Sequence, residues 1–212
     1  ISCSLVGSEM CIRDSKYSGY QKVAANVIAM DGTNWFSSFT IDKGSKEGIK
    51  KGMNVIAGSG LVGIVTDVGP NFAKVRSIID DSSNVSSMVL TTKDNFNVGG
   101  SLKSMNQDKV LPFTELRDED DKVKVGDPVV TSYVSDQYQE GILIGYIASI
   151  EKNANNLTKS GTITPVVDFQ HLREVLVITT LKDTGEKELS SQKASDTQTE
   201  TQDNTETQKS QE

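Results

Sequence analysis

The feature that most restricts the fold of this chain is a succession of short segments rich in Val, Ile, Thr and Phe, separated by clusters of Gly, Asn, Asp and Ser. β-Branched and aromatic residues favour strands, and the intervening residue types favour turns. Helical periodicity is scarce, so antiparallel barrels or sandwiches are the expected architectures. Strands are predicted at Val23–Met30, Ser38–Asp42, Asn54–Ala57, Gly60–Val68, Ala73–Ile78, Ser86–Thr91, Gly99–Ser104, Pro128–Thr131, Ile142–Ile150, Gly161–Val167 and Val175–Leu181.

A sequence pattern that occurs twice in the chain predicts two related β units. In each copy a Gly turn precedes a short Val-rich strand, and a second Gly opens a longer strand that a further Gly interrupts. The copies run from Gly52 to Val65 and from Gly126 to Ile147. A Gly inside a strand is typical of a bulge or sharp bend, which lets a small barrel curve. The alternative is that unrelated hairpins with Gly turns look alike by chance.

Changes of composition along the chain predict the domain boundaries. Lys93 to Asp121 is the most polar internal stretch, and we expect a long loop or flexible hairpin there. A first β-domain is predicted at 23–95, a second at 96–165 and a closing strand at 166–182. The sequence leaves open whether this strand returns to complete the first domain.

The formal net charge of −7 is unevenly distributed. Asp183 to Glu212 holds eight Asp and Glu against three Lys, which is −5 of the total. With Leu189 as its only large aliphatic residue, this segment cannot bury enough surface to offset its ordering entropy, so we expect a disordered acidic tail. An interaction tail is the alternative. Because Lys and Arg do not cluster elsewhere, nucleic acid is not an expected partner.

The first residues do not follow the pattern of the rest of the chain. Leu5 to Ser15 resembles the in-frame translation of a sequencing-library adapter, so residues 1–15 are interpreted as a disordered assembly artefact. Both cysteines, Cys3 and Cys11, lie there, and the remaining chain offers no disulfide framework. No apolar run reaches the length of about 18 residues that a membrane span needs.

Residues suited to catalysis or metal binding are few. A hydrolase triad could be composed of Ser132, Asp168 and the only histidine, His171. The residues around Ser132, however, do not match a sequence motif known for a catalytic nucleophile. No catalytic residues are therefore assigned. The acidic run Asp118–Asp121 could bind a cation, yet adjacent acids point in different directions and usually form a solvated turn. No zinc, P-loop or calcium-loop spacing is present, so no metal site or cofactor is predicted.

Several stretches together resemble the MreC family of bacterial rod-shape-determining proteins, from about Val23 to Leu181. Their order and spacing match as well. The stretches are Ala25–Ile28 through Asp31, Trp35 to Gly44, Gly48–Val55 with Gly60–Val65, Gly126–Ser132 with Gly141–Gly145, and Pro165–Phe169 followed by Leu172 and Val175–Ile178.

The resemblance implies one membrane-spanning helix, a coiled coil and a pair of small antiparallel β-barrels outside the membrane. Lys16 to Lys22 is accordingly expected to be the end of the coiled coil, and the membrane anchor to precede this chain. The chain departs from the family at Tyr133, where Gly is usual, and at Tyr138–Glu140, where Phe-Pro is common. These departures affect turn geometry rather than the assignment to the family.

The resemblance also implies a non-enzymatic scaffold of the wall-elongation complex that maintains rod cell shape. Its implied partners are further copies of itself, a MreD-type membrane protein, a penicillin-binding transpeptidase and a glycosyltransferase, with an actin-like shape filament contacted indirectly. Trp35 and Phe36 are candidate interaction residues, because aromatic side chains dominate interface energetics, but they are equally suited to packing over a barrel end. A periplasmic adaptor module of an efflux or secretion assembly is the main alternative; it requires long hairpin helices and lipoyl-like halves, which this sequence lacks.

Overall fold

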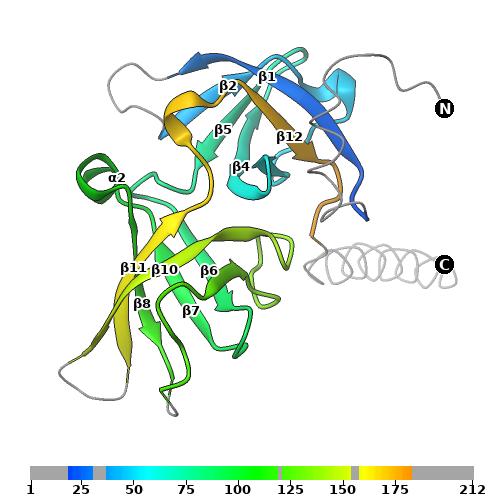
Figure 1. Ribbon diagram of the computed structural model, residues 1–212. Helices are drawn as coiled ribbons and strands as arrows, with labels where there is room; N and C mark the ends of the chain where they lie inside the picture. The colour runs from blue at the N-terminus through cyan, green and yellow to red at the C-terminus, as the bar shows by residue number, and fades with distance from the viewer. Residues whose placement is uncertain (1–18, 31–36, 119–120, 154–157, 183–212) are drawn as a thin grey trace, which may run out of the picture. The chain divides into compact units, whose positions relative to one another are not determined.

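The computed structural model describes residues 19–30, 37–118, 121–153 and 158–182, and it consists mainly of β-strands (Figure 1). A short α-helix, α2 (Leu102–Asp108), and two turns of 3-10 helix, η2 (Ser45–Glu47) and η3 (Phe169–His171), connect some of them. The strands are β1 (Lys22–Met30), β2 (Ser38–Ile41), β3 (Asn54–Ala57), β4 (Gly60–Val68), β5 (Ala73–Ser77), β6 (Asn84–Val89), β7 (Asn95–Gly99), β8 (Leu111–Leu116), β9 (Pro128–Thr131), β10 (Leu143–Lys152), β11 (Lys159–Pro165) and β12 (Glu174–Ile178).

The first barrel is a closed antiparallel ring of β1, β2, β5, β4, β3 and β12. Its last member comes from the far end of the described chain, because β12 lies between β1 and β3 and is hydrogen-bonded to both. The question that the sequence left open is thereby answered: the strand after Leu172 completes the first ring.

The second barrel is a closed antiparallel ring of β6, β7, β8, β11, β10 and β9. One parallel residue pair, Leu143 with Gly60, links it to the first barrel. The predicted all-β fold with two small antiparallel barrels is confirmed. Closure of both rings pairs the strand edges that an open sheet would leave free.

The repeated sequence pattern corresponds to equivalent hydrogen bonds in the two barrels. Gly52 N donates to Val65 O at 2.9 Å, and Gly126 N donates to Ile147 O at 2.7 Å. Both Gly52 and Gly126 adopt positive φ, at 89° and 94°. The interrupting glycine Gly145 adjoins a register shift, and a Cβ placed on it would lie 2.1 Å from the main-chain oxygen of Thr164. The predicted bend therefore has a physical cause in the close approach of a neighbouring strand.

Buried apolar side chains from both barrels form one contiguous core. Alternate residues of the strands point inward, as the period of two requires. In the second barrel Phe96 and Phe113 meet edge to face, with ring centroids 5.1 Å apart. The described residues up to Leu181 belong to one compact unit.

The stretch predicted as a loop, Lys93 to Asp121, differs most from expectation. It contains β7, α2 and β8, and the strand predicted at Gly99–Ser104 is wrong because Ser101 caps α2 by accepting a hydrogen bond from Ser104 N. A domain boundary at residue 95 would separate β6 from β7, which pair along their whole length. Strand pairing instead changes from the first barrel to the second between β5 and β6.

Some predictions concern residues at the margins of the described chain. Lys22, expected in a coiled-coil helix, is the first residue of β1. The adapter-like segment 1–15, residues 16–18 of the predicted coiled coil and the acidic tail 183–212 lie outside the described residues.

Candidate functional site

Three apolar side chains lie together on the outer side of the second barrel. The pairing of β6, β9 and β10 places Met88 opposite Val130, and Val130 opposite Leu143. They form a cluster separate from the main core, with exposed fractions of 4% to 8%. The neighbouring residues Val89 and Val129 point into the core of the barrel. Met88 and Val130, each one residue away, therefore lie on the opposite, outer face of the sheet.

A second row lies beside the first on the same strands. Tyr146 is opposite Pro128 on β9 and Thr164 on β11, and Leu90 N donates to Pro128 O at 2.9 Å. Leu90 and Tyr146 keep 45% and 44% of their surface exposed. We call the two rows together the outer apolar face; its residues are Met88, Leu90, Pro128, Val130, Leu143 and Tyr146.

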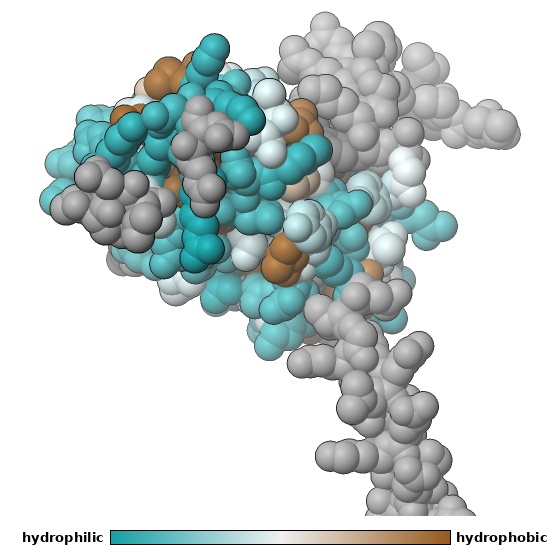
Figure 2. Space-filling view, turned by 90° about the horizontal axis from the view of Figure 1, so that it is seen from below, coloured by the Kyte–Doolittle hydropathy of each residue, from teal (hydrophilic) through white to brown (hydrophobic). Residues whose placement is uncertain are grey.

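Figure 2 shows one side of the molecule, on which brown apolar patches are small and separated by hydrophilic residues. On the outer apolar face, Leu90 and Tyr146 are the large apolar residues exposed enough to contact a partner, and exposed apolar side chains that lie together can mark protein contact surfaces.

The loop between β9 and β10 joins the second barrel to the first. Asn54 on β3, which is 2% exposed, donates from Nδ2 to Gln137 O at 2.9 Å and accepts from Gln139 N at 2.7 Å. Gln139 also donates from Nε2 to Thr180 O at 3.1 Å. Tyr138 is buried beside these contacts, and burial raises its pKa to about 12, although the charge of Arg76 acts in the opposite direction. The loop thus fixes the two barrels to each other.

The residues considered for a hydrolase triad are not brought together. His171 Nδ1 lies 2.7 Å from Asp168 Oδ2 on an exposed turn before β12. Ser132 is fully buried, and its hydroxyl donates to Asn95 Oδ1 at 2.6 Å. None of the contacts among the described residues joins Ser132 to His171, so the geometry offers no nucleophile and base pair.

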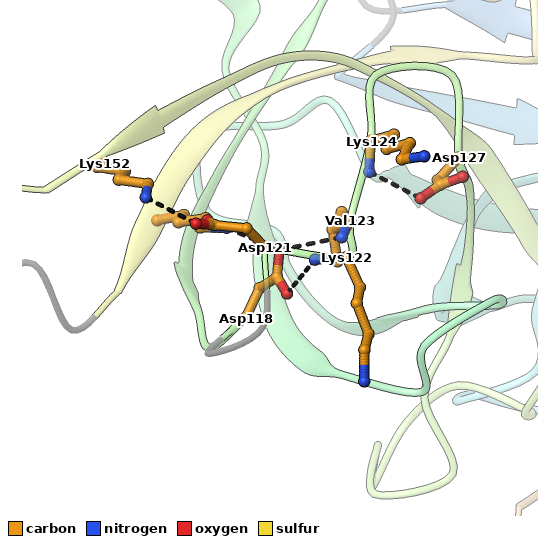
Figure 3. Close-up of polar contacts among 8 residues, drawn as sticks. Asp118, Asp121, Lys122, Val123, Lys124, Asp127 and Lys152 are labelled. Carbon is orange, nitrogen blue, oxygen red and sulfur yellow. Dashed lines mark hydrogen bonds and ion pairs between the residues drawn. The ribbon is translucent and has the colours of Figure 1, made fainter.

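Two acids of the run that was predicted as a solvated turn, Asp118 and Asp121, contact lysine side chains. Asp118 is buried and accepts from the main-chain N–H groups of Lys122 and Val123, at 2.9 and 3.0 Å (Figure 3). Its Oδ2 also accepts from Lys159 Nζ at 2.7 Å. Asp121 accepts from the same Lys159 and from Lys152, which Figure 3 shows reaching it from the neighbouring strand β10.

Titration of these groups reflects opposing effects. Burial acts to raise the pKa of Asp118, but hydrogen bonds from Lys159, Lys122 and Val123 outweigh it and hold that pKa below its usual value. Hydrogen bonds from Lys159 and Lys152 lower the pKa of Asp121 to about 2. For Lys159, burial disfavours the charge, but the two carboxylates outweigh burial and raise the pKa. The carboxylates and Lys159 are therefore charged together at neutral pH.

Sequence reasoning missed both Lys159 and the outer apolar face. Lys159 is 41 residues from Asp118, and no local pattern signals that pairing. The outer face had a signal in the sequence: apolar residues occupy nearly every position from Ile142 to Ile147, so both sides of β10 carry apolar side chains. The candidate interaction residues Trp35 and Phe36 lie outside the described residues.

Two further searches cover only the described part of the chain. Within it, no three His, Cys, Asp or Glu side chains are grouped so that they could hold a metal ion. In the same residues, no helix is both long enough and apolar enough to cross a membrane.

Comparison with known proteins assigns the family. The family model described as "Rod shape-determining protein MreC, barrel core" matches residues 27–179. The chain belongs to the MreC family. The resemblance found in the sequence is thereby confirmed, and the family is named for the determination of rod shape.

Individual MreC relatives agree with this assignment. The cell shape-determining protein MreC of Listeria monocytogenes is 34% identical over 161 residues, which cover 75% of this chain and 54% of the relative. The chain thus spans about half the length of that relative. A solved structure of Listeria monocytogenes MreC is 33% identical, with a TM-score of 0.68 over 78% of this chain and 79% of that one.

A more distant MreC structure comes from a complex. It is described as a complex between penicillin-binding protein PBP2 and MreC from Helicobacter pylori, with 12% identity and a TM-score of 0.56 over 76% of this chain and 100% of that one. At this identity the likeness shows the fold alone.

Proposed function

We propose that this chain is the barrel part of a non-enzymatic scaffold that binds a penicillin-binding transpeptidase of the cell-wall elongation complex and so maintains rod shape. The observation that carries the proposal is the match of residues 27–179 to the MreC barrel core. The Helicobacter pylori complex supports the choice of partner, because there a MreC protein is bound to PBP2.

The outer apolar face is the surface that we assign to this contact. Exposed Leu90 and Tyr146 continue the buried row of Met88, Val130 and Leu143, so a partner can cover apolar surface without rearranging the barrel. A large aromatic side chain such as Tyr146 is the residue type that most often dominates binding energy.

The remaining roles belong to the same proposal. Copies of the protein associate with each other, a MreD-type membrane protein and a glycosyltransferase join the assembly, and the actin-like filament is reached indirectly. An N-terminal anchor holds the protein at the cell membrane, with both barrels on the extracytoplasmic side. The family assignment supports these roles.

The test is binding of the purified chain to the extracytoplasmic part of the elongation transpeptidase from the same bacterium, measured by biolayer interferometry. Wild-type chain should bind saturably, and Tyr146→Glu should weaken binding by about tenfold or more, because a charge would face the partner's apolar surface. Ile28→Glu is the matched control, since Ile28 is an exposed apolar residue of the first barrel, 59% accessible. Absence of binding by the wild type would refute the proposed partner.

A further inference from the structure

A cavity of about 220 Å³ lies between the end of α2 and the segment that follows β11. Its lining is mainly apolar, and the residues are Met105, Lys109, Thr164, Pro165, Val166, Val167, Asp168 and Gln170. A volume of this order takes one apolar side chain from a partner rather than a whole cofactor.

The two charged residues of the cavity differ in how they are engaged. Asp168 accepts hydrogen bonds from His171 Nδ1 at 2.7 Å and from Gln170 N at 3.0 Å. Exposed Lys109, which ends α2 in a left-handed conformation, makes none of the ion pairs found among the described residues, although its charge helps to lower the pKa of Asp168. The cavity therefore suits an apolar group that is accompanied by a carboxylate able to reach Lys109.

The loop after β9 carries an exposed apolar side chain with a carboxylate close to it. Val134 is 58% exposed, and Asp136 follows two residues later on the surface. The backbone is held on both sides: Val134 N donates to Ser132 Oγ at 3.2 Å, and buried Ser135 Oγ accepts from Tyr138 N at 3.0 Å. A loop fixed in this way loses little conformational entropy when it binds.

The local charges distinguish Val134 from other exposed apolar residues. Val125 lies between Lys124 and Asp127, and Leu90 lies three residues before Lys93, so each would bring a lysine toward Lys109. Like charges brought together at an interface disfavour it. Val134 is accompanied by the carboxylate of Asp136, and no Lys or Arg occurs from residue 125 to residue 151.

We propose that Val134 of one copy enters the cavity of a second copy, with Asp136 beside Lys109. The inference rests on the self-association included in the proposed function and specifies its interface. Because the inserting loop and the receiving cavity are different surfaces, the contact is heterologous, and it extends into an open chain or a closed ring of copies.

Sedimentation velocity of the purified chain over a concentration series tests the interface. Wild-type protein should associate reversibly, and Val134→Glu, Lys109→Glu and Asp136→Lys should each raise the apparent dissociation constant by at least tenfold. The double variant Lys109→Glu with Asp136→Lys should regain association to within about threefold of wild type, because the charges are exchanged. Val125→Glu, at a 63% exposed apolar site, is the matched control and should associate normally.

A mixing experiment tests the heterologous geometry. Val134→Glu retains an intact cavity and Lys109→Glu retains an intact loop, so an equimolar mixture should form dimers that do not extend, although each variant alone stays monomeric. The sites of substitution are exposed, and thermal melting should show that all variants fold.

A wild-type chain that stays monomeric at every concentration would overturn the inference, as would unchanged association of the single variants or failure of the charge exchange to restore it. These results are separable from failure of the proposed contact with the transpeptidase. The monomeric chain can still be assayed for binding to the transpeptidase, and loss of that binding would contradict the proposed function by itself.

Discussion

Lys159 Nζ lies 2.7 Å from Asp118 Oδ2, and the two side chains keep only 9% and 2% of their surface exposed. The pair joins β11 to the segment that follows its neighbouring strand β8. Removing one partner of such a buried ion pair strongly destabilises the folded state, because the charge that remains is desolvated and unpaired.

Asp118→Ala should therefore lower the free energy of unfolding by about 3 kcal/mol, measured by urea denaturation. The substitution also removes the acceptor for the N–H groups of Lys122 and Val123. Lys152→Ala is the control: its ion pair with Asp121 is 61% and 60% exposed, so little change is expected. Equal effects of the two substitutions would show that burial of Asp118 does not matter.

The same cluster predicts how stability depends on pH. The pKa of Asp118 is lowered on folding, and that of Asp121 falls to about 2, whereas an unfolded Asp titrates near 4. The unfolded chain therefore binds protons first as the pH falls, and stability from these groups is present above about pH 4 and lost between about pH 4 and 2. Urea midpoints measured from pH 6 to 2 should fall less steeply for Asp118→Asn than for wild type. Parallel curves would exclude Asp118 as a source of acid sensitivity.

Gly145 should not tolerate a side chain. An alanine Cβ there would lie 2.1 Å from Thr164 O, which is main chain and cannot move without disturbing the pairing of β10 with β11. Gly145→Ala should cost about 2 kcal/mol or more in thermal or urea unfolding. Gly99→Ala is the matched substitution within a strand, because the nearest atom to its Cβ would be 4.0 Å away, and it should be close to neutral.

Asn54 should control the β9–β10 loop from the other barrel. Asn54→Ala removes one donor and one acceptor and leaves Gln139 N unpaired, at a cost of about 2 kcal/mol. Hydrogen exchange should accelerate at Gln139 and its neighbours, with the β7 and β8 amides unaffected. Asn97→Ala, which removes only a 3.3 Å contact to Glu115, serves as the control and should not alter exchange in the loop.

The fold could be predicted where local pattern and tertiary structure agree. Asn54–Ala57, Gly60–Val68 and Pro128–Thr131 were predicted with the observed bounds, because β-branched runs there end at turn residues. β8 was missed because its buried residues Leu111, Phe113 and Leu116 follow a polar stretch and do not keep a strict alternation. Their burial depends on β7 and β11, which contact them only in the folded barrel.

The candidate site was less accessible to sequence reasoning. Met88 on β6 is distant in the chain from Val130 and Leu143 on the consecutive strands β9 and β10, and only the strand register shows that the three form one row. Asp118 appeared to be one of four equivalent acids until Lys159, 41 residues away, distinguished it. Alternation along a strand predicts which side chains share a face, but not which faces meet.

The position of β12 has a consequence for synthesis of the protein. A chain made from its N-terminus produces β1 and β3 long before Glu174–Ile178, the strand that must lie between them. Until then the first ring has a gap, with two unsatisfied edges able to accept a foreign strand. The second ring is encoded entirely within that interval, so it can close while the first waits. Release from the ribosome or cleavage before residue 174 would consequently yield a closed second barrel attached to a first barrel that stays open, with strand edges free to pair with other chains.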